Sequence, residues 1–232
     1  MRLFFALTFS PAARAALRQA QERLRAFAPG ARYPGEETLH LTLAFLGETP
    51  QGRAPQLGEL LAALPAPPLA LRFSQAGPLS PEEGLWALFP EECPTLFALQ
   101  GELAARLEGA GFPLPRRPFR PHVTLARRVA FPGPAPRGQD LLPRPLSVPC
   151  GRVSLLRSQL RPQGPLYTEL AARPWTWADI PRKKRGRPAF PKGGKAGRFL
   201  RFLQVLTGPR RALAGRRGSS RTVAGTPASP GA

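Results

Sequence analysis

The pattern of apolar and polar positions in the first third of the chain predicts alternating strands and helices. Residues 2–9 (RLFFALTF) are rich in Phe and Leu and predict a strand. Ser10 and Pro11 then give the start signal of a helix, an N-cap residue followed by proline in the first turn. Apolar residues at helical spacing continue this helix to Phe27, and Pro29-Gly30 end it. A strand over 40–47, a helix with leucines on one face (Leu57, Leu60, Leu61 and Leu64) and a strand over 69–73 follow.

The same order of elements returns about 82 residues later. Residues 84–90 overlay the first strand, and a helical pattern that opens at Pro94 overlays the first helix. Strands predicted over 122–129 and 151–160 overlay those at 40–47 and 69–73. We therefore expect an internal repeat, about 1–80 and 84–172, within one domain over 1–179. The predicted fold class is α+β, with two pseudo-symmetric lobes of antiparallel or mixed sheet and outer helices around a central groove.

Charge divides the chain into two parts. The formal net charge is +20, and residues 180–232 hold 14 Lys and Arg but no Asp or Glu. This segment is also rich in Gly and Pro, so we expect a basic, largely disordered tail. Its Arg185-Gly186-Arg187-Pro188 resembles the core of a motif that reads the DNA minor groove. Non-specific attraction of the tail to nucleic acid, and a solvated tail without a partner, are the alternatives.

Composition sets the expected compartment. The two cysteines, Cys93 and Cys150, form no disulfide framework, so a reduced, cytoplasmic setting is the simpler interpretation. No apolar run approaches the roughly 18–20 residues that span a bilayer, and we expect no membrane partner. We also expect a monomer.

The chain has only two histidines, and each is followed two positions later by threonine. The motifs are HLTLAFLG (40–47) and HVTLARRV (122–129). On a strand, residues i and i+2 point to the same side, so His40 and Thr42 share one face, as do His122 and Thr124. If the two lobes meet about a pseudo-twofold axis, these faces bring two imidazoles and two hydroxyls together.

This set of side chains suits the cleavage of a phosphate ester. Histidine titrates near pH ~6.5, so one ring can be neutral and accept a proton while the other is protonated and donates one. The threonine hydroxyls can donate hydrogen bonds to non-bridging phosphate oxygens. Two His with two Thr make a poor zinc site, so no metal or cofactor is expected. A lone His-x-Thr is usually a satisfied polar pair, but two copies that use every histidine favour function.

With these motifs, the sequence resembles the 2H phosphoesterase superfamily, and within it the RNA 2′,3′-cyclic phosphodiesterases, once called 2′–5′ RNA ligases. The resemblance covers about 1–172. It rests on RLFFAL near the start, ETLHLTLAFLGE (37–48), FRPHVTLAR (119–127) and LLRSQLRPQGPLYTEL (155–170). It implies a metal-independent enzyme that opens 2′,3′-cyclic phosphate ends of RNA or nucleotides to 2′-phosphates. It also implies that His40 is the proton donor, that His122 is the proton acceptor, and that Thr42 and Thr124 bind phosphate.

Other residues leave alternatives open. Arg127 either lies at the rim of the groove and guides RNA or is a solvated surface residue. Arg120, together with Arg116 and Arg117, either contacts RNA or belongs to a solvated loop. Tyr167 and Trp86 could stack a base, although packing is the more common role, and Phe45 is expected in the core.

Two rival functions remain at this point. One is a non-catalytic nucleic-acid-binding protein that acts through its basic tail. The other is a 2H enzyme that acts on another cyclic phosphate.

Overall fold

The computed structural model describes residues 1–65, 69–162 and 164–175, and the predicted tail over 180–232 lies outside the described residues. The described chain forms eight strands, four α-helices and two short 3-10 helices. In chain order they are β1 (Arg2–Thr8), α1 (Pro11–Phe27), η1 (Glu36–Thr38), β2 (His40–Glu48), η2 (Gln51–Arg53), α2 (Ala54–Ala62), β3 (Leu69–Ser80), β4 (Leu85–Pro90), α3 (Pro94–Gly109), β5 (Val123–Ala126), α4 (Gly138–Leu141), β6 (Leu146–Cys150), β7 (Arg152–Arg161) and β8 (Gly164–Pro174).

All eight strands belong to one open sheet in the order β6-β3-β4-β5-β2-β1-β7-β8. Every neighbouring pair is antiparallel. The predicted α+β class is therefore confirmed, and of the antiparallel and mixed alternatives the sheet is the antiparallel one. The order is symmetric about the boundary between β5 and β2, where β2, β1 and β7 on one side correspond to β5, β4 and β3 on the other.

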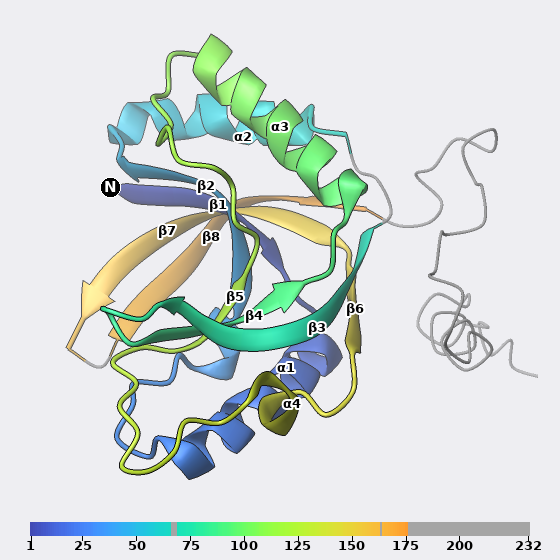
Figure 1. Ribbon diagram of the computed structural model, residues 1–232. Coiled ribbons are helices and arrows are strands. Elements are labelled where there is room, and N and C mark those ends of the chain that lie inside the picture. The colour runs from blue at the N-terminus through green and yellow to red at the C-terminus, as the bar shows by residue number, and fades with distance from the viewer. Residues whose placement is uncertain (66–68, 163, 176–232) are drawn as a thin grey trace, which may run out of the picture. The chain divides into compact units, whose positions relative to one another are not determined.

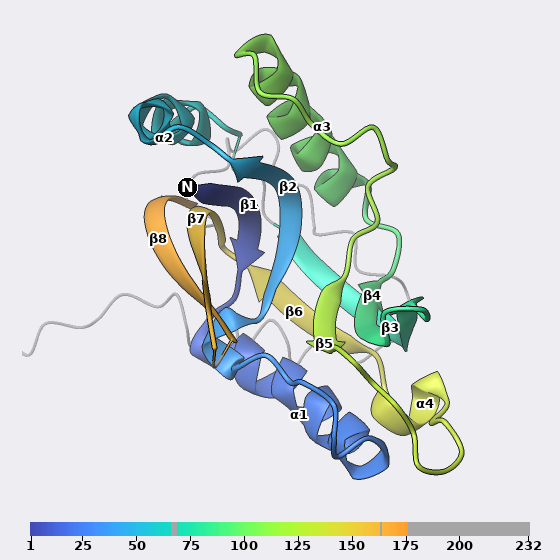
Figure 2. The ribbon, with the colours of Figure 1, turned by 90° about the vertical axis from the view of Figure 1, so that its left-hand side faces the viewer.

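The strands do not stay with the half of the chain from which they come. β7, from the second half, pairs with β1, whereas β3, from the first half, pairs with β4. The helices also cross over, since α1 contacts β5 and β6, and α3 contacts β2 and α2. In Figures 1 and 2, α2 and α3 accordingly lie together on one side of the molecule, and α1 and α4 lie together on the other.

One face of the sheet carries the helices and the main core. Leu3, Phe5 and Leu7 of β1 point into this core beside Leu41 and Leu43 of β2 and alternating residues of the other strands. Buried leucines of all four helices join the same core, among them Leu17, Leu57, Leu103 and Leu141. Among the described residues no helix packs on the opposite face of the sheet, which we call the polar face.

Local signals explain where several elements begin and end. The Ser10 hydroxyl accepts a hydrogen bond from the Ala13 amide, so the predicted cap of α1 is confirmed. β5 is shorter than the predicted 122–129, because it ends at Ala126 and Arg128 adopts a left-handed conformation with φ 54°. Arg127 instead forms an isolated antiparallel bridge with Arg32.

The expectation that Phe45 lies in the core is wrong. The β1–β2 ladder contains a register shift between Phe5 and Ala6, so Leu43 and Ala44 are both buried and the alternation changes phase. Phe45 is therefore 37% exposed, and the guanidinium of Arg2 lies over its ring.

Candidate active site

The two His-x-Thr motifs meet where β2 pairs with β5. Leu41 and Val123 are register partners in this antiparallel ladder, and both side chains are fully buried in the core. Their neighbours therefore point to the polar face. Continuing the register by one residue places His40 opposite Thr124 and Thr42 opposite His122. All four residues are partly exposed.

Each imidazole is oriented by a backbone carbonyl two residues before it. His40 Nδ1 lies 2.6 Å from the carbonyl oxygen of Thr38, and His122 Nδ1 lies 2.8 Å from that of Arg120. A carbonyl can only accept, so Nδ1 carries the proton in both rings and donates it. Nε2 is then the nitrogen left to accept or donate a proton in both rings.

Burial lowers the pKa of both histidines. For His40, desolvation has the largest effect, the hydrogen bond to Thr38 opposes it, and the charges of His122 and Arg127 lower the pKa further. For His122, desolvation again has the largest effect, the Arg120 carbonyl opposes it, and Arg127, Arg120 and Arg117 lower the pKa. At neutral pH these shifts favour neutral rings, the form a general base needs.

The two arginines singled out from the sequence lie near this pair. Arg127 is exposed, and its charge acts on both histidines and on Tyr167. The end of β5 at Ala126 and the left-handed Arg128 explain why Arg127 escapes the strand alternation. Arg120 is exposed, supplies the carbonyl that orients His122, and acts on that ring by its charge.

The aromatic residues weighed from the sequence have different surroundings. Trp86 is 8% exposed and packs edge-on against Phe131, so its role is packing. Tyr167 lies beside His40, with ring centroids 5.2 Å apart and planes at 90°. Sequence reasoning missed Phe4, whose ring lies 5.1 Å from that of His40. The FF pair at 4–5 gave no signal as to which phenylalanine faces the histidine.

A chain of polar side chains on the same face also escaped sequence reasoning. Thr8 is the register partner of His40, and its hydroxyl lies 3.0 Å from that of Ser154. Ser154 is fully buried and donates to a Glu169 carboxylate oxygen at 2.7 Å, which in turn pairs with Arg152. Ser154 is therefore held between two hydrogen-bond partners, and this network of polar side chains lies on the polar face next to His40.

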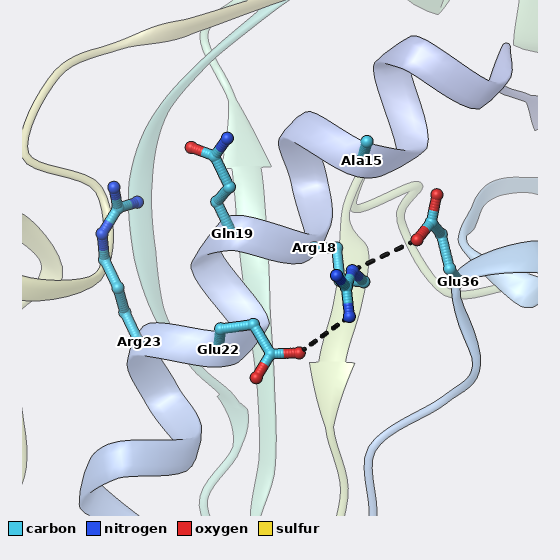
Figure 3. Close-up of a pocket in the computed structure, with 6 residues that line it drawn as sticks. All are labelled: Ala15, Arg18, Gln19, Glu22, Arg23 and Glu36. Carbon is cyan, nitrogen blue, oxygen red and sulfur yellow. Dashed lines mark hydrogen bonds and ion pairs between the residues drawn. The ribbon is translucent and has the colours of Figure 1, made fainter.

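A surface pocket on α1 is separate from the histidines (Figure 3). Arg18 bridges Glu22 and Glu36 there, each at 3.2 Å, so the charges at its centre satisfy one another. Because Glu36 belongs to η1, which ends at Thr38, this pair ties α1 to the turn that orients His40. Exposed ion pairs of this kind contribute only about 0–1 kcal/mol. The pocket is lined by Ala15, Arg18, Gln19, Glu22, Arg23 and Glu36.

The described part of the chain offers neither a metal-binding cluster nor a membrane-spanning helix. Residues 1–65, 69–162 and 164–175 contain no group of three or more His, Cys, Asp or Glu side chains that could hold a metal ion. Within the same residues, no helix is both long and apolar enough to cross a membrane.

The chain is similar to known proteins over most of its length. A family model described as the 2′-5′ RNA ligase superfamily matches residues 6–161. The chain is 40% identical over 191 residues to an RNA 2′,3′-cyclic phosphodiesterase of Thermus thermophilus, covering 73% of this chain and 88% of that protein.

Solved structures are similar as well. A crystal structure of a Thermus thermophilus protein is 36% identical, covers 75% of this chain and 97% of its own, and gives a TM-score of 0.60. Escherichia coli LigT complexed with 3′-AMP is 26% identical, covers 75% of this chain and 98% of its own, and gives a TM-score of 0.63.

Proposed function

The chain belongs to the 2′-5′ RNA ligase superfamily, and on that premise we propose that it is a metal-independent phosphodiesterase that opens 2′,3′-cyclic phosphate ends of RNA or nucleotides to 2′-phosphates. The observation that carries this proposal is the Leu41–Val123 register, which brings the two His-x-Thr motifs side by side on one face of the sheet. The naming of three relatives as RNA 2′,3′-cyclic phosphodiesterases supports the choice of a cyclic phosphate as substrate.

Each side chain has a role in one in-line displacement. His122 Nε2 accepts a proton from water as the water oxygen bonds to phosphorus. The bond from phosphorus to the ribose 3′-oxygen breaks, and His40 Nε2 gives that oxygen a proton, which leaves a 3′-hydroxyl and a 2′-phosphate. Thr42 and Thr124 donate hydrogen bonds to the non-bridging oxygens, where negative charge builds up.

The electrostatics of the site suit this division of work. Burial and the nearby arginine charges lower the pKa of His122, which favours the neutral ring that a general base needs. His40 must be protonated, whereas burial lowers the pKa of its ring too. The anionic substrate provides the opposite charge, because a phosphate bound between the rings favours the imidazolium form.

Arg127 and Arg120 are proposed to attract the RNA backbone. Both are exposed and lie close enough to the histidines for their charges to act on them. Contacts from arginine to phosphate release counterions, so binding of an oligonucleotide should weaken as salt is raised.

The test uses the full chain with 2′,3′-cyclic AMP and with an oligonucleotide that ends in a cyclic phosphate. His40→Ala and His122→Ala proteins run beside it, with Gln19→Ala on the exposed face of α1 as the matched control. We expect the 2′-phosphate as product, a loss of about 10²–10⁴ in rate for either histidine variant, and no loss for the control.

Two results would argue against the proposal. Turnover that survives both histidine substitutions would place the chemistry elsewhere. Binding of RNA without turnover by any form of the protein would favour the rival function, a binding protein that acts through its basic tail.

A further inference from the structure

The two histidines have matching backbone partners but different surroundings. Each Nδ1 donates to the carbonyl two residues before it. His40, however, lies against two aromatic rings, those of Phe4 and Tyr167. Among the described residues no ring packs against His122, and the groups that act on it are arginines. The pseudo-symmetry of the two motifs is therefore broken by the side chains around them.

The rings beside His40 form a closed triangle. The centroids of Phe4 and His40 are 5.1 Å apart, those of Phe4 and Tyr167 5.1 Å, and those of His40 and Tyr167 5.2 Å. The planes of Phe4 and Tyr167 meet at 72° and those of His40 and Tyr167 at 90°, whereas those of Phe4 and His40 are tilted at 44°. Edge-to-face contacts at such distances are favourable and directional, so the Tyr167 ring limits the rotation of both of its neighbours, and the Phe4 ring closes the third side.

The triangle rests on a small apolar cluster of its own. Phe4, Ala6 and Leu156 are buried on the polar face, apart from the main core, and Tyr167 packs against them. This cluster is separate from the core on the other side of the sheet, and it supports the two rings that contact the histidine.

Resting on the proposed function, we propose that Phe4 and Tyr167 are positioning residues that hold the His40 imidazole so that Nε2 faces the leaving oxygen. His40 has no carboxylate partner among the hydrogen bonds of the described residues, and its Nδ1 is held only by the Thr38 carbonyl. The charged or titratable groups that act on it are His122 and Arg127. The Thr38 carbonyl thus takes the place of the carboxylate that often orients a catalytic histidine, and the two aromatic rings restrict rotation of the imidazole about that hydrogen bond.

This arrangement also suits the protonated ring. An imidazolium close to the face of an aromatic ring is attracted to the negative charge of the π-system. His122 lacks such neighbours among the described residues and lies among guanidinium groups, which oppose its protonation. Arg127 acts on both rings, but Arg120 and Arg117 act on His122 alone, so the difference in surroundings fits the proposed roles of His40 as proton donor and His122 as proton acceptor.

The inference is tested on the full chain by ¹⁵N NMR of the imidazole nitrogens, which is simple because the chain has only two histidines. The variants are Tyr167→Leu and Phe4→Leu, and Tyr167→Phe is the matched control that keeps the ring. In the unchanged protein and in Tyr167→Phe, neutral His40 should show the Nδ1–H tautomer. In both leucine variants its two nitrogen shifts should move toward an average, while those of His122, the internal reference, stay in place.

Kinetics give the second measurement. With a cyclic-phosphate substrate, the leucine variants should lose about tenfold or more in kcat, a part of the 10²–10⁴ that a well-placed general acid supplies. KM should change little, and Tyr167→Phe should keep its activity. A merely structural role would leave the tautomer of His40 unchanged in whichever leucine variant folds.

The two hypotheses fail in different ways. If the leucine variants keep the His40 nitrogen shifts of the unchanged protein, the inference is overturned, whatever the activity. If the unchanged protein turns over no cyclic phosphate, the proposed function fails, and the tautomer comparison still decides whether the rings position His40.

Discussion

Leu41→Ala should lower kcat by more than its loss of folding stability alone explains. Leu41 is fully buried and is the β2 partner of Val123 where the two motifs meet. A Leu→Ala change in a core costs about 2.7–5 kcal/mol, a large part of the roughly 5–15 kcal/mol that holds a domain together. For a domain of this size, a loss of about 3 kcal/mol lowers Tm by roughly 6–12 °C.

Leu57→Ala is the matched control for this substitution. Leu57 lies in α2, is also fully buried and belongs to the same core, but it is not in the β2–β5 ladder. We expect a similar fall in Tm by calorimetry for both variants. Activity is then compared well below both melting temperatures, so that each protein is folded during the assay.

The difference in kcat tests whether the β2–β5 register aligns the site. A cavity under Leu41 lets β2 shift against β5, and a misplacement of about 1 Å in a catalytic group can cost 10²-fold in rate. We expect Leu41→Ala to lose at least about tenfold more kcat than Leu57→Ala. Equal activity of the two variants at matched stability would refute the reasoning.

Three further predictions follow from the same geometry. Arg127→Gln removes a charge that lowers the pKa of both His40 and His122, so both pKa values should rise. Because the working state has His40 protonated and His122 neutral, the bell-shaped pH profile of kcat/KM should move to higher pH. A profile that stays in place would contradict this. Ser154→Ala removes the hydroxyl that contacts both Thr8 and Glu169 and should cost about 0.5–1.5 kcal/mol in chemical denaturation, because the exposed Glu169 keeps Arg152 and water as partners. An unchanged midpoint would show that the network contributes nothing to stability. Activity should survive prolonged dialysis against EDTA, since the described residues offer no cluster of three or more metal-binding side chains, and loss restored by a divalent cation would refute this.

The sequence predicts the elements of the fold where the local signal is strong. The strand over 2–9 and the helix after Ser10-Pro11 are in place, because alternation, capping and leucine spacing are properties of neighbouring residues. β6 and β8 were not predicted. β8 carries Leu166 and Leu170 among Pro, Thr, Glu and Ala, with no clear alternation, and it forms because β7 offers a free edge.

The candidate site is predictable in part for the same reason. Two His-x-Thr motifs stand out by repetition, and strand geometry alone places each histidine on the side of its threonine. Their meeting across β2 and β5 depends on pairing between distant segments, as does the approach of Tyr167 to His40. Phe45 shows the limit of alternation, because a single register shift in the β1–β2 ladder turns its side chain outward.

The exchange of third strands between the two halves has a consequence for how the molecule folds. β1 gains its second neighbour only when β7, about 150 residues later, has been made, and α1 packs on strands that do not yet exist when it emerges. Such non-local contacts raise the contact order and slow folding. During synthesis the sheet around the first histidine motif is therefore complete only after nearly the whole domain has been made. We expect a nascent chain to gain phosphodiesterase activity in one late step, rather than half by half.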